Sequence, residues 1–88
     1  MRVEDATRMI ISPYVTEKTF NMMERENKMV FIVNERANKR AIKQAIEILY
    51  EVKVESLNTA KTIYGKKAYV KLSKENAATD LAAKLGIV

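Results

Sequence analysis

Apolar residues recur with helical spacing between Asn38 and Tyr50, and this is the clearest pattern in the chain. At about 100° per residue, six apolar side chains fall on one broad side of the segment: Ala41, Ile42, Ala45, Ile46, Ile48 and Leu49. The opposite side carries four charged residues: Lys39, Arg40, Lys43 and Glu47. Asn38 is placed to accept a backbone N–H of the first turn. The pattern predicts an amphipathic helix with a basic outer face.

The segment Lys28–Val33, just before this helix, has the alternation of a strand but is apolar on both faces. Met29 and Phe31 point to one face, and Val30 and Ile32 point to the other. Because a strand buried on both faces needs layers above and below its sheet, we expect a helix on each side.

Two strands are predicted after the central helix. Val52–Leu57 alternates apolar and polar residues until Ser56-Leu57 breaks the alternation, which indicates a bulge. Asn58–Ile63 continues as a polar, β-branched ribbon, and a turn follows at Tyr64-Gly65-Lys66. Lys67–Leu72 returns, with Ala68, Val70 and Leu72 on one face and Lys67, Tyr69 and Lys71 on the other.

Shorter elements flank this unit. We expect a helical turn at Arg2–Arg8, a brief edge strand at Met9–Ile11 that Ser12-Pro13 stops, and a helix from the Thr16 N-cap to about Arg25. A last helix is predicted from Ser73 to Leu85, ended by Gly86. Phe20 and Met23 would form the inward face of the helix after Thr16.

These elements predict a single α+β domain over residues 1–88, a split β-α-β sandwich with a four-stranded antiparallel sheet covered by helices. The strands before and after the central helix would run parallel, with the hairpin strand inserted between them. The strand at Met9 would join at the outer edge. No apolar run is long enough to span a membrane, and the acidic N-terminus is not a signal peptide.

Charge is unevenly distributed along the chain. Residues 1–35 carry five Lys/Arg against six Asp/Glu, whereas residues 36–74 carry ten against three. A basic middle segment attracts polyanions, although a solvated basic face with no such partner is an equally good interpretation of charge alone. The chain has no His and no Cys, and we see no phosphate-binding or nucleophile motif. We therefore predict no enzyme activity, no cofactor and no metal site.

The basic residues form three groups with polar neighbours, a mixture that suits phosphate binding. One follows the central helix, one follows the hairpin, and the third is Lys18 beside Thr16. The predicted RNA-binding residues are Thr16, Lys18, Arg36, Lys39, Arg40, Lys43, Asn58, Thr59, Lys61, Lys66 and Lys67. Tyr64 and Tyr69 lie among the lysines and could stack on a base, but Tyr69 could equally pack under a helix. Most of the aromatic residues of the RNA-recognition-module strand signature are missing from 65–72, which favours a folded RNA surface as the ligand.

Four stretches, in order and with matching spacings, resemble the ribosomal protein L23 family. Residues 12–18 read SPYVTEK, similar to the family's P-x-V-T/S-E-K signature. Residues 37–50 read ANKRAIKQAIEILY, similar to its A-x-K-x-x-I-K-x-A-V/I-E helix. Residues 52–59 and 66–72 read VKVESLNT and KKAYVKL, similar to its V-x-V-x-x-V-N-T and KKAYV-x-L strands. Leu57 stands where Val is usual.

The resemblance implies a cytoplasmic, non-enzymatic component of the large ribosomal subunit. It would bind domain III of 23S rRNA beside the polypeptide exit tunnel, contact neighbouring large-subunit proteins, and be a monomer when free. The short hairpin at 58–67 and the last helix resemble the archaeal form of the family. The Glu of the T/S-E-K signature corresponds to Glu17, which with Glu24 and Asn27 is predicted to dock the signal recognition particle or other nascent-chain factors.

Two other functions fit parts of the sequence. A free-standing RNA-binding module would bind short single strands and would need exposed aromatic residues, most of which are missing. A small-ligand regulatory domain would need a pocket with a few convergent polar groups and would be expected to dimerise.

Overall fold

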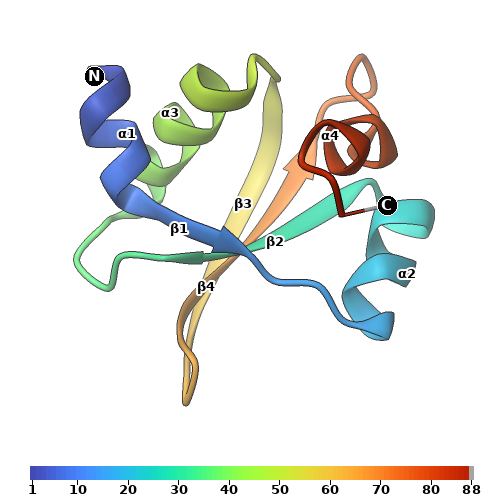
Figure 1. Cartoon of the computed structure of the whole chain (residues 1–88), viewed down its shortest axis with the longest axis horizontal. Helices are drawn as coiled ribbons and strands as arrows, with labels where there is room; N and C mark the ends of the chain where they lie inside the picture. The colour runs from blue at the N-terminus through green and yellow to red at the C-terminus, as the bar shows by residue number, and fades with distance from the viewer. Residues whose placement is uncertain (88) are drawn as a thin grey trace.

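The computed structural model describes residues 1–87, which form four helices and four strands (Figure 1). The elements follow the predicted order: α1 (Val3–Met9), β1 (Ile10–Pro13), α2 (Glu17–Glu26), β2 (Lys28–Val33), α3 (Lys39–Tyr50), β3 (Val54–Thr62), β4 (Gly65–Leu72) and α4 (Ala78–Lys84). No helix of this part of the chain is both long enough and apolar enough to cross a bilayer.

The four strands form one sheet in the order β1-β2-β4-β3, and every neighbouring pair is antiparallel. Strand β4 therefore lies between β2 and β3, which run parallel to one another on either side of it. Strand β1 lies at the outer edge, beside β2. This arrangement confirms the predicted split β-α-β sheet.

All four helices share one hydrophobic core with the sheet. The buried apolar side chains of α1, α2, α3 and α4 belong to a single cluster that contains Met29, Phe31 and Val33 but not Val30. The expectation of a helical layer on each face is therefore wrong. Val30 is nevertheless buried: Tyr69 is its partner on β4, the Tyr14 N–H donates to its carbonyl at 2.8 Å, and Tyr14 and Val30 line the same small hollow.

The strand alternation of β4 decides which residues face away from this core. Ala68, Val70 and Leu72 are buried in the cluster, so Lys67, Tyr69 and Lys71 lie on the opposite side of the sheet. We call that side the open face. Tyr69 thus does not pack under a helix, which settles one of the two alternatives for that residue.

The predicted N-caps of α2 and α3, Thr16 and Asn38, are both confirmed. The Thr16 hydroxyl accepts the Thr19 N–H at 3.2 Å, and the Thr19 hydroxyl accepts the Thr16 N–H at 2.7 Å, so the two residues form a reciprocal cap. The Asn38 side chain accepts the Ala41 N–H at 2.8 Å in the same way. Helix α2 ends at Asn27, which adopts the left-handed conformation with φ of 56°.

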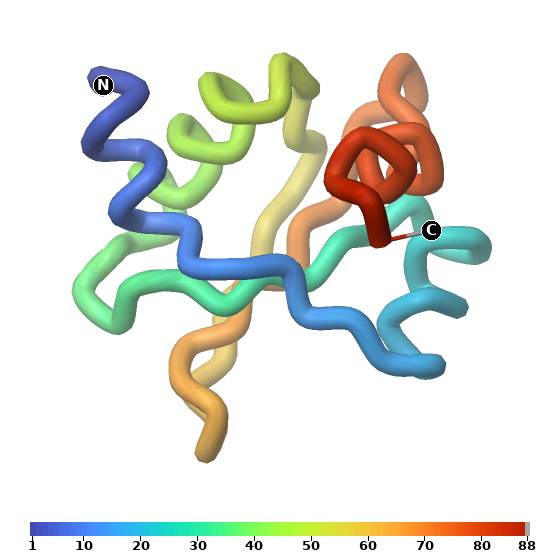
Figure 2. Tube along the Cα trace, viewed as in Figure 1, coloured from blue at the N-terminus to red at the C-terminus, as the bar shows by residue number. Residues whose placement is uncertain are grey.

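Other boundaries differ from the prediction. Met9 belongs to α1, and β1 continues through Pro13, which an edge strand tolerates because its outer side needs no N–H donor. The bulge lies between Val54 and Ser56, slightly earlier than predicted. The tip of the hairpin is at Ile63-Tyr64, and Gly65 already pairs with Thr62. Figure 2 shows this hairpin extending beyond the body of the domain.

Helix α4 begins at Ala78 and not at Ser73. Residues 73–77 instead form a turn that hydrogen bonds from Asn27 hold against α2. Because these bonds come from a residue about fifty positions earlier, no pattern near Ser73 could reveal them. Gly86, with φ of 76°, ends the helix as predicted.

Candidate nucleic-acid interface

The open face gathers cations, aromatic rings and an amide from three adjacent strands. The register places Lys28 opposite Lys71, and Tyr69 opposite both Val30 and Asn58. Lys67 lies opposite Ile32 on the same face. Apart from Asn58, which is exposed, the polar side chains of this set are half-buried, since their aliphatic or aromatic parts lie along the sheet. The result is a surface with positive charge and flat apolar patches between the charges.

Three ion pairs occur within residues 1–87, and two of them border the open face. Lys28 Nζ is 3.5 Å from a Glu26 carboxylate oxygen, and Lys71 Nζ is 3.9 Å from one of Glu55. These four side chains are between 29% and 50% exposed, so water screens both pairs, and such pairs contribute about 0–1 kcal/mol each. An incoming phosphate can therefore replace either carboxylate at little cost.

Lys67 takes part in none of these ion pairs and instead lies against aromatic rings. Its Nζ is 3.7 Å from the centre of the Tyr14 ring and 5.4 Å from the centre of the Tyr64 ring. The two ring centres are 6.0 Å apart, with planes inclined at 39°. Cation–π contacts fix the position of the ammonium group but leave its charge uncompensated. Lys67 is thus a positioned cation on the open face.

The α3 residues predicted to bind RNA form a second surface. Lys39, Arg40 and Lys43 are exposed, while Ile42 and Ile46 of the same helix are fully buried against the sheet. The basic stripe consequently points away from the sheet on the helical side, opposite to the open face. The structure therefore places the α3 stripe and Lys67 on opposite sides of the domain.

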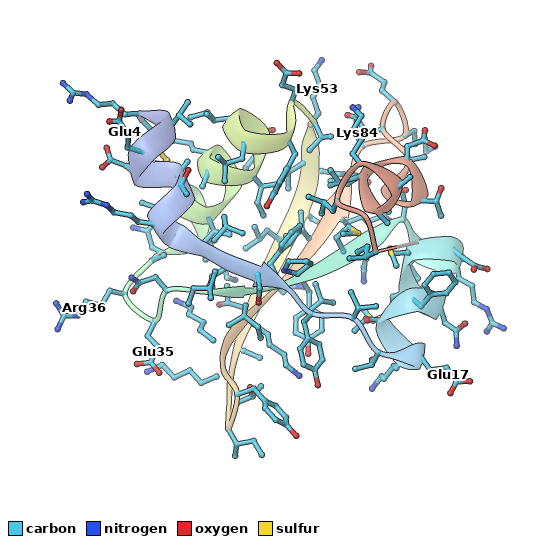
Figure 3. All side chains as sticks on the ribbon, viewed as in Figure 1. Glu4, Glu17, Glu35, Arg36, Lys53 and Lys84 are labelled. Atoms are coloured by element: carbon cyan, nitrogen blue, oxygen red, sulfur yellow. The ribbon has the colours of Figure 1, made fainter. Side chains whose placement is uncertain are left out.

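The hairpin joins the start of α3 through Lys66. Lys66 Nζ donates to the Ala37 carbonyl at 2.6 Å, one residue before the Asn38 cap. Lys61 lies opposite Lys66 in the hairpin and is exposed. Arg36 is exposed on the loop that leads to α3 and points outward at one edge of the domain (Figure 3). The predicted basic groups of the central helix and of the hairpin therefore meet where Arg36, Lys61 and Lys66 lie. We call this region the hairpin end.

Asn58 and Thr59 are neighbours in sequence but lie on opposite faces of β3. Asn58 is on the open face with Tyr69, whereas Thr59 pairs with Ala68 on the helical side and is half-buried. Only Asn58 can therefore act together with Lys67. The two residues face opposite sides because successive side chains of a strand alternate between the two faces of a sheet.

The residues predicted around α2 lie elsewhere. Glu17, which precedes Lys18, is on the opposite side of the view from Arg36 in Figure 3. The Thr16 hydroxyl is engaged in the helix cap, while Glu17, Lys18 and Glu24 are exposed. This group is separate from the hairpin end, and it presents acidic as well as basic side chains.

Asn27, the third predicted docking residue, is half-buried and its carboxamide is used internally. Its Nδ2 donates to the carbonyl oxygens of Leu72, Ser73 and Asn76 at 3.2, 3.2 and 2.8 Å. Its Oδ1 accepts the Ala78 N–H at 2.6 Å. The side chain holds α2, β4 and α4 together, so its effect on any docking surface would be indirect.

The predicted RNA-binding residues leave out three residues of the open face: Tyr14, Lys28 and Lys71. Lys28 could have been found, because it continues the alternation of Val30 and Ile32. Tyr14 carried no such signal, since it precedes α2 and reaches Lys67 only through the fold.

Other hollows of the surface lie away from the open face. One of them, with a volume of about 520 Å³, is an open depression lined by Met1, Asp5, Arg8, Met9, Asn34 and Gln44. In residues 1–87 no three acidic side chains gather as metal ligands would. Burial raises the pKa of the Tyr50 phenol, whose ring stacks on Phe31 with ring centres 5.6 Å apart.

Comparison with known proteins shows the family of the chain. The family model for ribosomal protein L23 matches residues 8–65. The large ribosomal subunit protein uL23 of Methanothermobacter thermautotrophicus is 43% identical over 84 residues, which cover 94% of this chain and 98% of the relative. The protein of the same name from Picrophilus torridus is 49% identical over 78 residues, covering 89% and 95% of the two chains. The chain therefore belongs to the ribosomal protein L23 family.

Proposed function

We propose that this protein is a structural component of the large ribosomal subunit that binds 23S rRNA through the open face and the hairpin end. Membership of the ribosomal protein L23 family and the names of its two relatives support the assignment to the large subunit. The observation that carries the RNA interface is the open face, where Lys28, Lys67 and Lys71 surround Tyr69 and Asn58.

Phosphate contacts supply most of the affinity in this proposal. Lysine side chains neutralise phosphates and release counterions, so binding weakens as salt rises. Asn58 adds a neutral hydrogen-bonding group, which sets the register of the backbone without contributing charge. Tyr69 offers a flat surface to a ribose or a base.

The α3 stripe extends the interface to the other side of the domain. Because the open face and the stripe of Lys39, Arg40 and Lys43 point in opposite directions, one straight RNA helix cannot contact both. A folded RNA that surrounds the hairpin end can contact both, since Lys66 brings the hairpin against the start of α3. A compact rRNA domain is thus the ligand that this charge distribution favours, and we assign it to domain III beside the exit tunnel.

The surface around Glu17 and Glu24 would serve a different partner. It belongs to the first 35 residues, which carry five basic against six acidic residues and would not attract phosphate. We assign this surface to docking of the signal recognition particle or other nascent-chain factors, and its borders to neighbouring large-subunit proteins. Lys18, at the same helix start, would then contact rRNA at the margin of the docking surface.

The test is binding of the full chain to a folded 23S domain III transcript over a salt series, with an unrelated structured RNA of equal length as competitor. We expect tight binding that resists the competitor. Lys67→Glu and Lys43→Glu should each weaken binding and reduce the salt slope by about one unit for each phosphate that is no longer neutralised. Glu17→Lys is the matched control, which should preserve rRNA binding and weaken factor docking. Equal affinity for both RNAs would refute the ribosomal ligand and favour a general RNA-binding module.

A further inference from the structure

The tip of the β3–β4 hairpin exposes two large apolar residues. Ile63 is 93% exposed and Tyr64 is 63% exposed. The turn itself is well defined, because the Thr62 hydroxyl donates to the Gly65 carbonyl at 2.9 Å and accepts the Tyr64 N–H at 3.1 Å. Gly65 has φ of 111°, a conformation that other residues rarely adopt. An ordered turn thus presents an aromatic ring to solvent.

The body of the protein holds the Tyr64 ring from one side. Tyr14 is anchored to β2 through its N–H bond to Val30, and its ring centre lies 6.0 Å from that of Tyr64. The Lys67 ammonium group lies near both rings, at 3.7 Å from the centre of Tyr14 and 5.4 Å from that of Tyr64. Tyr14 and Lys67 therefore orient the Tyr64 ring before any ligand arrives, while most of the side chain stays accessible.

The charge around this ring identifies the chemistry of its partner. Residues 56–74 contain five lysines and no Asp or Glu. Such a field favours a polyanion, and a ring in that field favours a polyanion with flat aromatic groups. RNA has both, with a phosphate on each side of every nucleoside. A protein partner would need an acidic rim around an apolar pocket, and base stacking beside a phosphate explains the ring and the lysines together.

We propose that Tyr64, oriented by Tyr14 and Lys67, is a stacking site for an unpaired nucleobase of a structured RNA. The adjacent phosphate of that nucleotide would lie at Lys67, whose charge has no acidic partner among the described residues. The proposal rests on the RNA-binding function proposed above and names the element of the RNA that the hairpin recognises. Preorientation of the ring lowers the entropy cost of stacking the base.

Replacing the Tyr64 ring tests the contribution of stacking to RNA affinity while leaving the lysine charges unchanged. Tyr64→Leu keeps an apolar side chain but removes the aromatic face, and should weaken binding to the domain III transcript by roughly 5- to 100-fold. The salt slope should not change, because every lysine that neutralises a phosphate is still present. Tyr64→Phe is the matched control, which keeps the ring and should bind within about twofold of the wild type. Equal affinities for the wild type and Tyr64→Leu would overturn the proposal even if the wild type prefers the domain III transcript.

A fluorescent reporter gives an independent test at the same position. The chain has no tryptophan, so Tyr64→Trp introduces a single indole. Stacking of a base on this indole should quench its emission on RNA binding, whereas an unchanged or enhanced emission would overturn the proposal. If the wild type binds the domain III transcript and the competitor equally, the proposed ribosomal function fails. Quenching of the indole emission by either RNA would still show that a base stacks at position 64, and no quenching by either would overturn the stacking proposal.

Discussion

Asn27 should be the most sensitive polar residue of the fold, and Asn27→Ala is the change that tests this. Its carboxamide bonds the carbonyl oxygens of Leu72, Ser73 and Asn76 and the N–H of Ala78. Asn27 also adopts the left-handed conformation, with φ of 56°, which asparagine tolerates better than alanine. The substitution therefore removes a junction of α2, β4 and α4 and strains the backbone at the same position.

The magnitude follows from these hydrogen bonds and from the backbone conformation. The amide has two N–H groups and one bonded oxygen, so the substitution removes about three full hydrogen bonds at roughly 0.5–1.5 kcal/mol each. The left-handed backbone adds about 1 kcal/mol for alanine. The free energy of unfolding should thus fall by about 2.5–5.5 kcal/mol, a large part of the ~4–13 kcal/mol expected for a domain of this size.

Urea denaturation followed by far-ultraviolet circular dichroism measures this decrease. Asn27→Gly is the matched control, since glycine removes the same hydrogen bonds without the backbone strain. It should be more stable than Asn27→Ala by about 1 kcal/mol. A decrease below about 0.5 kcal/mol in both variants would show that the amide bonds do not hold the junction. Equal stability of the two variants would show that the left-handed backbone at position 27 does not strain the alanine variant.

Two further predictions concern the core. Ile46 is fully buried in α3, so Ile46→Ala should lower the free energy of unfolding, measured in urea, by about 2–5 kcal/mol. Ile63→Ala, at the exposed hairpin tip, should change it by less than about 0.5 kcal/mol. Similar effects of the two substitutions would contradict the assigned core. Because burial raises the pKa of Tyr50, the folded state favours the neutral phenol. The stability that depends on the neutral phenol is therefore fully present below the unfolded pKa near 10.0 and is lost as the pH rises above it. In Tyr50→Phe the alkaline decline of stability, measured by urea denaturation between about pH 8 and 11, should be shallower; an identical decline in both proteins would exclude this residue as a cause.

Much of the fold could be predicted because its signals are local. The 3.6-residue period of α3, the Thr16 and Asn38 caps and the alternation of β4 each involve residues a few positions apart. The predicted strand order was confirmed too: a hairpin allows β4 on either side of β3, and the structure has it between β2 and β3, as the split β-α-β arrangement predicts. Local failures occurred where a distant group intervened, as at the start of α4, where Asn27 holds residues 73–77 in a turn.

The sequence by itself determined the elements, the excess of basic residues after residue 35 and the family motifs. Only the tertiary structure decided which sheet face the helices leave open, and therefore that Lys67 and Asn58 lie on one side while Lys43 lies on the other. It also decided that Lys67 lies beside Tyr14, more than fifty positions earlier in the chain. The physical reason is that periodicity records which side chains share a face of an element, whereas the packing of distant segments fixes what that face meets.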